Sequence, residues 1–333
     1  MNQPQQPEAI YTVGLDPERP RHLLVEVQWH VQGAETRFRL PQWRPGRYEQ
    51  SLFVRNLVAL TAQNENGEPL PVIKTEASEW LVYHSGSTTL RLSYRYFANQ
   101  PDAGACWADP EWMYVNPVHC LMYREDSMGQ PCRLHVRTEG MSTSAGPIII
   151  ATSLHGQADQ GYTASDYHEL VDSPWMASAQ LQRLDWVSEG VAFVLWMHGV
   201  QSPDEAMQAQ ICRQWEAMAS VQIQTLGGFP QDEFHFMLVG LPYAFYHGVE
   251  HRRTMRTRQV LPDFFGGETR DGRQPTHHRF EQVVHDRLRG APCQTGGRCG
   301  VETILDDVQP EATKVYHAEL VQLLVDLVEL VGL

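Results

Sequence analysis

The chain has 333 residues, of which 42% are hydrophobic and 20% are charged, and its formal net charge at pH 7 is −14. This length and composition are typical of a packed globular protein with two domains rather than of a disordered chain. The surplus of carboxylates excludes nucleic acid as the expected partner, because phosphate binding requires clustered Lys and Arg side chains.

The amino terminus and the cysteines indicate the expected compartment. The first ten residues are polar and contain prolines, without the apolar segment of a secretory signal or a membrane anchor. The 6 cysteines include no Cys-x-x-Cys pair, which argues against a zinc ribbon and against a small disulfide scaffold. We therefore expect a cytoplasmic protein with reduced thiols and no membrane partner.

Short β-rich runs separated by turn residues occupy the first part of the chain, from Tyr11 to Phe97. This spacing predicts a domain built on antiparallel sheet. Asn66-Gly67 separates two of the runs and predicts a hairpin turn, because both residues tolerate a positive φ. The predicted strands are 23–29, 36–40, 57–63, 80–83 and 89–96.

The next region is expected to begin with a long surface excursion. Residues 99–116 are rich in Pro, Asp and Trp, a composition typical of exposed loops. Strands are predicted to resume at 119–123, 132–136 and 148–152.

A second unit is predicted from residue 191 onward, with strands at 191–198 and 233–241. Ser202-Pro203-Asp204-Glu205 is typical of a helix start, and the helix is expected to run to about Thr225 and to end at Gly227. The apolar residues expected to face the core are Ala206, Ile211, Trp215, Met218 and Val221.

Three short segments stand out from this background. The first, residues 40–48, places Trp43 and Tyr48 around Pro41, Pro45 and Gly46. The prolines remove backbone donors and the glycine permits a turn, so the segment is predicted to be a rigid structural loop.

The second segment, residues 162–174, is rich in residues that favour turns and helix caps and precedes Pro174. It is interpreted as a passage between domains. Its carboxylates Asp166, Glu169 and Asp172 are expected to serve as caps or turn residues rather than as a catalytic acid and base.

The third segment, residues 246–251, follows the apolar run at 233–241. Glycine allows a close approach of the backbone to a ligand, so Glu250 just after Gly248 is a candidate for holding the ammonium group of a substrate. The alternative is that Glu250 pairs with Arg252 or Arg253 on a solvated edge.

The three segments contain motifs that follow one another in this order: Leu40-Pro-x-Trp43-x-Pro45-Gly46-x-Tyr48, then Asp166-Tyr-x-Glu-Leu-Val-Asp-Ser-Pro174, then Gly248-Val-Glu-His251. Together these motifs resemble the glycyl aminopeptidase family of zinc metallopeptidases, metallopeptidase family 61. The resemblance covers residues 10–251. It implies an α+β fold with an amino-terminal antiparallel β domain followed by a thermolysin-like domain, here incomplete. It further implies a peptide partner with a free amino terminus and zinc as the family's cofactor. The substrate-binding residues implied are Gly248, Val249, Glu250 and His251.

The chain departs from the family pattern downstream, because it contains no His-Glu-x-x-His motif. That motif places two histidines on one helix face to hold zinc, with the glutamate activating the bound water. The residues nearest to such a set are His278, Glu281 and His285, which would share a helix face but are differently spaced. The alternative is a polar segment without a metal. No catalytic residue is identified, and we expect this chain to hold no cofactor.

The expected domains are therefore 1–165, the β domain; 166–251, the first part of the thermolysin-like domain; and 252–333, an irregular tail ending in a helix at 310–331. The tail is rich in Arg and Gly and lacks strand or helix periodicity before residue 301, which is typical of a shifted reading frame or of a pseudoenzyme. Two functions remain open. One is an inactive metallo-aminopeptidase-like protein, and the other is a non-catalytic module that binds peptides.

Overall fold

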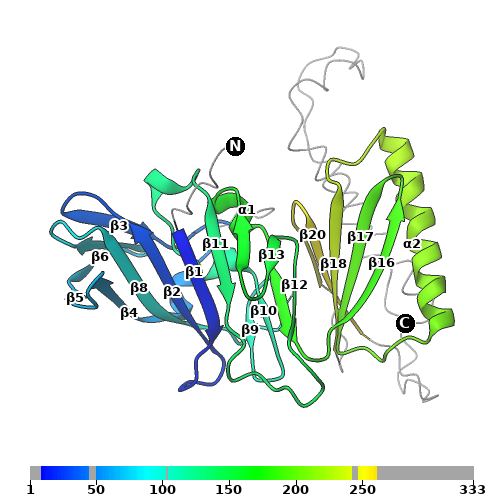
Figure 1. Ribbon diagram of the computed structural model, residues 1–333, viewed down its shortest axis with the longest axis horizontal. Helices are drawn as coiled ribbons and strands as arrows, with labels where there is room; N and C mark the ends of the chain where they lie inside the picture. Colours follow the sequence, from blue (N-terminus) through cyan, green and yellow to red (C-terminus); the bar gives the residue numbers. More distant parts are fainter. Residues whose placement is uncertain (1–8, 45–49, 103, 242–246, 261–333) are drawn as a thin grey trace, which may run out of the picture.

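The computed structural model describes residues 9–44, 50–102, 104–241 and 247–260. Within these ranges the chain is mostly β-sheet with few helices (Figure 1). A β-rich unit occupies the left of the view, and a sheet backed by one long helix occupies the right. The predicted tail helix and the histidines at 277–285 lie outside the described residues.

The largest sheet has eight strands in the order β13-β14-β11-β1-β2-β8-β4-β5. Buried and half-buried residues alternate along β2, as expected for a strand with one face on a core. All the pairings in this sheet are antiparallel except that of β1 with β11. The bounds are β1 Ala9–Leu15, β2 His22–His30, β4 Leu57–Asn64, β5 Pro69–Leu70, β8 Thr89–Phe97, β11 Cys132–Val136, β13 His155–Gln157 and β14 Gly161–Ala164.

Two smaller sheets complete the β-rich unit. One has the order β3-β7-β6 and the other the order β12-β15-β10-β9. Their strands are β3 Glu35–Arg39, β6 Val72–Glu76, β7 Glu79–Tyr83, β9 Trp107–Ala108, β10 Trp112–Val115, β12 Ile149–Thr152 and β15 Trp175–Ser178. The short helices are η1 Phe53–Asn56, η2 Pro117–His119, η3 Glu125–Ser127 and α1 Tyr167–Val171.

The predicted strand at 119–123 is wrong, and three buried tyrosines explain why. The hydroxyl groups of Tyr167, Tyr94 and Tyr11 donate to consecutive backbone carbonyls, at 2.6 Å to Leu121, 2.7 Å to Cys120 and 2.9 Å to Met122 respectively. Buried carbonyls need a partner, and here side chains supply it in place of a neighbouring strand. The segment therefore crosses the core as irregular chain after η2, with both sides buried.

The surface excursion expected at 99–116 is also wrong. The segment contains β9 and β10, and Met113, Tyr114 and Val115 are fully buried. Prolines and aspartates mark its turns, whereas the short run at 112–115 contributes to the core. Because β10 has only four residues, its periodicity was too short to distinguish it from a loop.

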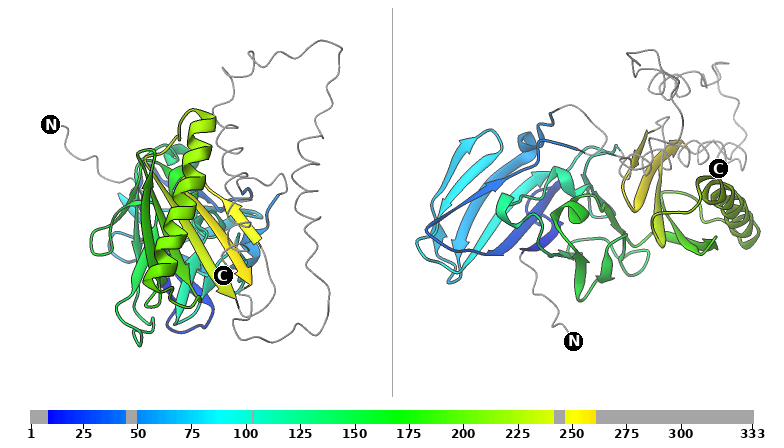
Figure 2. Two further views of the ribbon diagram at one scale, coloured as in Figure 1. Left: turned by 90° about the vertical axis from the view of Figure 1, so that its right-hand side faces the viewer. Right: turned by 90° about the horizontal axis from the view of Figure 1, so that it is seen from above.

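The second unit is a five-stranded sheet with the order β16-β17-β18-β20-β19. Helix α2 connects β17 to β18, which run parallel, and it lies against the outer face of the sheet (Figure 2). The bounds are β16 Gln182–Ser188, β17 Val191–His198, α2 Glu205–Leu226, β18 Glu233–Leu241, β19 His247–Glu250 and β20 Thr254–Val260.

Helix α2 confirms the predicted limits. The side chain of Asp204 caps its start by accepting from the backbone N–H of Met207 at 2.8 Å, and Gly227 ends it with a φ of +78°. Of the five residues expected to face the core, Ile211 and Trp215 are buried and Met218 packs against the same cluster. Ala206 and Val221 are exposed, because the buried stripe continues through Ala219 and Ile223 instead.

The opposite face of this sheet packs on the β-rich unit. Val194, Trp196 and Met237 from β17 and β18 share one core with Tyr114 from β10 and Met176 from β15. The five-stranded sheet is thus covered on one face by α2 and on the other by the four-stranded sheet. The two units form a continuous structure with a common apolar layer.

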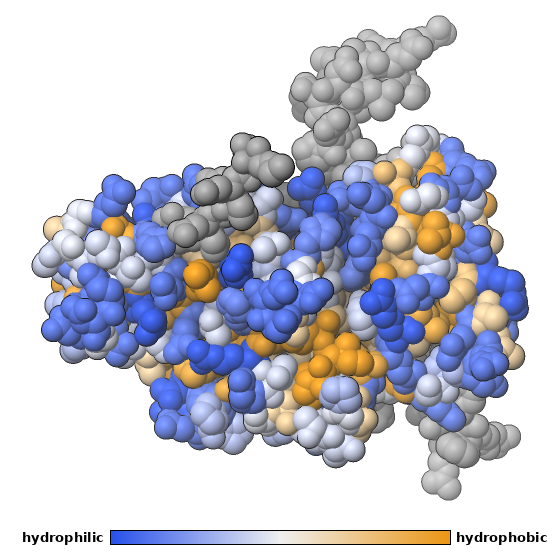
Figure 3. Space-filling model, viewed as in Figure 1, coloured by the Kyte–Doolittle hydropathy of each residue, from blue (hydrophilic) through white to orange (hydrophobic). Residues whose placement is uncertain are grey.

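The surface shows how hydrophilic and hydrophobic side chains are distributed over the two units. On the face shown in Figure 3, hydrophilic side chains predominate, and the largest hydrophobic area lies near the middle of the molecule. Across the described ranges, neither helix combines the length and the hydropathy that crossing a membrane requires.

Strand β20 extends the structure past the expected end of the second unit. Residues from 252 onward were expected to be irregular, yet β20 pairs in parallel with β18, and Thr254 and Met255 are buried. The strand was not predicted from the sequence, because its alternating arginines leave no alternation of apolar and polar residues. The remaining tail, from residue 261, lies outside the described residues.

Candidate functional site

The second sequence segment begins with a capped helical turn. The carboxylate of Asp166 accepts from the backbone N–H of Glu169 at 2.8 Å, and Glu169 accepts from the backbone N–H and the hydroxyl of Ser165 at 2.6 and 2.7 Å. The arrangement resembles a capping box, except that Glu169 accepts from the residue before the cap instead of from the backbone N–H of Asp166 itself. Both carboxylates therefore serve α1, as the sequence predicted.

The same bonds set the charge state of Glu169. Partial burial of its carboxyl would raise the pKa, but the hydrogen bonds from Ser165 and the positive charges of Arg253 and Arg252 outweigh this effect. The pKa of Glu169 is lowered as a result. A carboxylate held ionised in this way acts as a fixed negative charge beside the end of β19.

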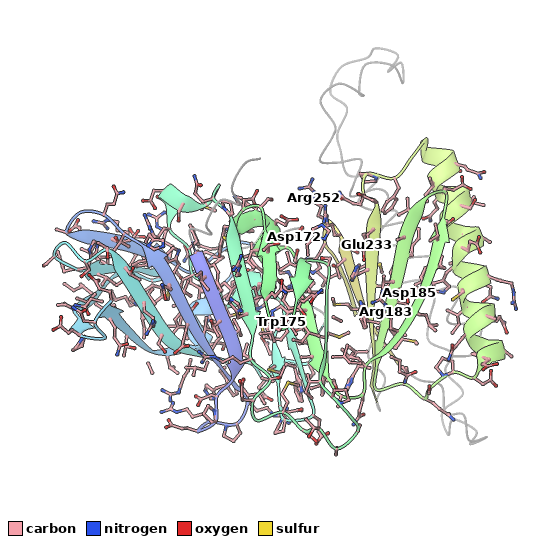
Figure 4. The ribbon with its side chains drawn as sticks, in the orientation of Figure 1. Asp172, Trp175, Arg183, Asp185, Glu233 and Arg252 are labelled. Carbon is pink, nitrogen blue, oxygen red and sulfur yellow. The ribbon has the colours of Figure 1, made fainter. Side chains whose placement is uncertain are left out.

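Asp172 has a different role, because it joins the β-rich unit to the edge of the five-stranded sheet. Its Oδ1 accepts from Nδ1 of His251 at 2.9 Å, and its Oδ2 accepts from the backbone N–H of Arg252 at 3.0 Å. In Figure 4, Asp172 and Arg252 lie near each other where the two units meet. Two predicted segments that are 79 residues apart, counted from Asp172 to His251, thus meet directly.

Within the described residues, the third segment forms β19 and begins the connection that leads to β20. The backbone N–H of His251 donates to the carbonyl of Thr254 at 2.7 Å and closes a tight connection between these strands. His251 is 3% exposed, and Val249 is also buried. Gly248 is half-buried, whereas Glu250 is exposed.

Glu250 lies at the end of an edge strand. It pairs in register with Met255, which belongs to the core beneath α2, so Glu250 is on the same face of the sheet as that helix. Among the described residues, no ion pair joins Glu250 to Arg252 or Arg253. The carboxylate is therefore open to solvent at the sheet edge instead of being occupied by its arginine neighbours.

Arg253 anchors the other side of the hairpin connection. Its Nε donates to the side-chain oxygen of Gln231 at 3.1 Å, and its Nη1 donates to Nε2 of His155 at 3.2 Å. The same Nη1 lies 4.0 Å from Oε1 of Glu169. Residues from both units thus surround this guanidinium and hold the connection in place.

The first segment also reaches this region. The ring of Trp43 lies beside that of His168, with centroids 5.8 Å apart, and Arg44 donates to the carbonyl of Gly104 at 3.1 Å. Residues 45–48 of the predicted loop lie outside the described residues. The three sequence segments therefore converge through Trp43 with His168 and through Asp172 with His251.

Sequence reasoning named Gly248, Val249, Glu250 and His251 but did not assign Asp172 or Arg253 to the site. A signal for Asp172 was present, because it lies in the same motif as the capping residues. The partnership with His251 could not be read from the sequence, since it depends on how the two units pack. The contacts of Arg253 depend on the same packing.

A zinc site cannot be assembled from the described residues. Three protein ligands with His, Cys, Asp or Glu donors are the usual minimum for catalytic zinc, and no such group converges within the described ranges. The weak candidates His278, Glu281 and His285 lie outside those ranges. The donors among the described residues therefore do not fit zinc.

Comparison with solved structures shows what the fold resembles. An aminopeptidase N family protein from Idiomarina loihiensis matches with a TM-score of 0.68 at 20% identity, over 79% of this chain and 44% of that chain. An M1 zinc metallopeptidase mutant from Deinococcus radiodurans, bound to a Tyr-Ser-Ala substrate, matches with a TM-score of 0.41 at 16% identity, over 74% of this chain and 58% of that chain. The chain thus spans less than two thirds of either structure.

Comparison at the level of sequence is more specific. Among curated proteins, none matches the chain. The family model described as the peptidase M61 N-terminal domain matches residues 11–179, which include the first two segments and Asp172. This match covers half of the chain, and the similarity to the first solved structure extends beyond it. The chain belongs to the family defined by the peptidase M61 N-terminal domain.

Proposed function

We propose that this chain is a metallo-aminopeptidase-like protein that binds peptides by their free amino terminus, with Glu250 as the group that holds the ammonium. The five-stranded sheet with α2 is the first part of a thermolysin-like domain in this proposal. Support comes from the parallel β17-α2-β18 crossover followed by an antiparallel edge strand. The fold similarity, which continues past residue 179, is a second support.

The observation that carries the proposal is the state of Glu250. Its carboxylate is exposed at the end of β19, and no arginine neighbour within the described residues neutralises it. A peptide ammonium would form a charge-assisted hydrogen bond with it, worth about 1.5–3 kcal/mol when water is excluded. That energy corresponds to roughly a tenfold to hundredfold difference in affinity.

The position of β19 adds a physical reason for binding an extended peptide. In the described part of the sheet, β19 pairs with β20 on one side, and its other side is an edge. An edge strand offers backbone N–H and C=O groups to a peptide in extended conformation. The peptide backbone would then align along β19 while Glu250 holds its amino end.

Hydrolysis is a separate matter from binding. In zinc peptidases the metal activates water and polarises the scissile carbonyl. This chain has no His-Glu-x-x-His motif, and its described donor set does not fit zinc. We therefore propose binding without peptide hydrolysis for the chain as it stands.

The test compares tripeptides that have a free amino terminus with their amino-acetylated forms. The parent chain should bind the free forms at least tenfold more tightly. Glu250→Gln should abolish this preference, whereas Glu205→Gln, which makes the same change at an exposed site on α2, should preserve it. An unchanged ratio in Glu250→Gln would contradict the role of this carboxylate.

The proposal that the chain does not hydrolyse peptides is tested separately. Purified full-length chain should contain well under one zinc ion per molecule after exhaustive dialysis and should release no free amino acid from the same tripeptides. Stoichiometric zinc together with chelator-sensitive release of amino acids would show that the chain is an active peptidase.

A further inference from the structure

The edge strand that carries Glu250 is weakly supported by its own sheet. Strand β19 has four residues and, among the described strands, pairs with β20 alone. A short strand paired on one side is marginal without further contacts. Something else must fix the end of β19, where Glu250 lies.

Asp172 supplies this contact from the other unit. One of its oxygens accepts from the imidazole of His251 and the other accepts from the backbone N–H of Arg252. These two residues directly follow Glu250 in the chain. The hydrogen bonds therefore act on the backbone within two residues of the carboxylate that is proposed to hold the ligand.

The burial of His251 makes its hydrogen bond to Asp172 more important. His251 is 3% exposed, and its Nε2 is buried without a hydrogen-bond partner among the described residues. Asp172 is thus the polar group that holds the ring. Without it, both ring nitrogens would be buried and unpartnered, which is unfavourable because neither protein nor water replaces the lost hydrogen bond. The connection between β19 and β20 would rearrange to relieve that cost.

Arg253 provides a second anchor, with a different origin. Its bond to Gln231 comes from the same unit as β19, whereas Asp172 follows α1 in the β-rich unit. Removing Asp172 therefore takes away the contacts that act on His251 and Arg252, while Arg253 keeps its bonds to Gln231 and, in the β-rich unit, to His155. This difference allows positioning to be separated from global folding.

We propose that Asp172 is a positioning residue, which acts through His251 and Arg252 to hold the end of β19 so that Glu250 meets the amino terminus of a bound peptide. This inference rests on the proposed function. It assigns to the β-rich unit a direct part in amine recognition, because the residue that orients the binding carboxylate belongs to that unit.

The test uses the full chain and three substitutions. Asp172→Ala removes both acceptors, and the ratio of affinities for free and amino-acetylated tripeptides should fall at least tenfold, since misplacement by about 1 Å can cost a hundredfold. Asp172→Asn should stay within about threefold of the parent, because its Oδ1 can accept from Arg252 while its Nδ2 donates to the other tautomer of His251. Asp185→Ala, at an exposed ion pair on the opposite edge strand, should leave the ratio unchanged.

The ratio distinguishes positioning from a purely structural role. A structural role would weaken binding of both peptide forms equally and would leave the ratio at the parental value, and this outcome would overturn the proposal. Should Asp172→Ala fail to fold, Asp172→Ser provides the same comparison, because its hydroxyl is too short to reach both donors.

A second readout does not depend on the ligand. Hydrogen exchange at the amides of β19 and of Arg252 should accelerate at least tenfold in Asp172→Ala but not in Asp185→Ala, while β17 and β18 keep their protection. Unchanged exchange in β19 would overturn the positioning role even if Glu250 binds the amine. If the parent chain shows no preference for a free amino terminus, the proposed function is refuted. The exchange result would still decide whether Asp172 holds the strand.

Discussion

The indole of Trp43 lies against the imidazole of His168, with ring centroids 5.8 Å apart and ring planes inclined by 35°. This contact joins the first sequence segment to α1. Trp43 is half-buried and packs against the main core of the β-rich unit. Trp43 therefore has a structural role, as predicted, although it is less buried than full enclosure in the core would require.

We expect Trp43→Ala to lower the free energy of unfolding by about 2 kcal/mol. The value is below the roughly 3–5 kcal/mol typical of a fully buried tryptophan, because part of the ring is already in contact with water. Urea denaturation measures the change. A double-mutant cycle with His168→Ala should give a coupling energy of about 0.5–1.5 kcal/mol, whereas the pair Phe97→Ala and His168→Ala should be additive. A melting temperature equal to that of the parent would contradict this contact.

The start of α2 provides a second prediction. Asp204 accepts from the backbone N–H of Met207 at 2.8 Å and satisfies a donor that the helix itself leaves free. Asp204→Ala should cost about 1 kcal/mol, the usual value for a lost cap. Asp185→Ala is the control, because this carboxylate lies in an exposed pair. Equal stability of the two variants in thermal denaturation would show that the cap contributes nothing.

Elements with a long period or a strong boundary signal were predictable from the sequence. The limits of α2 followed from Asp204 and Gly227, and β18 was predicted at its observed bounds because its apolar run is long. Strand β10 and the segment around Met122 were not predictable. A run of four residues carries no usable period, and the carbonyls of the buried segment are satisfied by tyrosines from distant elements.

The candidate site also contains residues that could be predicted from the sequence and residues that could not. Glu250 could be named because it lies in a short motif beside Gly248, and a motif is local. Asp172 lies in another motif, but its bond to His251 joins residues 79 positions apart and depends on the packing of two units. Contacts of that kind are created by tertiary structure, which a pattern of neighbouring residues does not encode.

A buried carboxylate in the three-stranded sheet makes stability depend on pH. Glu79 accepts from Thr75 at 2.7 Å, from Arg39 at 2.7 Å and from Arg37 at 2.8 Å. These hydrogen bonds, that of Thr75 first, lower the pKa of Glu79 from its ordinary value of 4.5 to about 2. Because the folded pKa is the lower one, the stabilising contribution is complete above the unfolded pKa and is lost as the pH falls toward the folded value.

Glu79→Gln should therefore be less stable than the parent at pH 7, and the difference should shrink between pH 4.5 and pH 2. Urea denaturation of both proteins at pH 7, 4 and 2.5 measures the trend. A difference that stays constant over this range would mean that the loss comes from packing and not from the ionised carboxylate.

The last prediction concerns the layer shared by the two units. Met237 is 0% exposed and lies in the core that β17 and β18 form with β10 and β15. Met237→Ala should cost about 2–5 kcal/mol, as is usual for a truncated buried methionine. Val221→Ala, at a residue on α2 that is 64% exposed, should change the stability by less than about 0.5 kcal/mol.

Hydrogen exchange reveals whether Met237→Ala destabilises both units. If the two units unfold together, Met237→Ala should reduce the protection of β10 and β15 as much as that of β17 and β18, and unfolding should remain a single transition. A fragment that ends at residue 179 would lack the covering sheet and should bind a dye for exposed apolar surface, which the full chain should not do. Unchanged protection of β10 and β15 in Met237→Ala would instead show that the β-rich unit is stable by itself, and that the shared layer only docks one finished unit on the other.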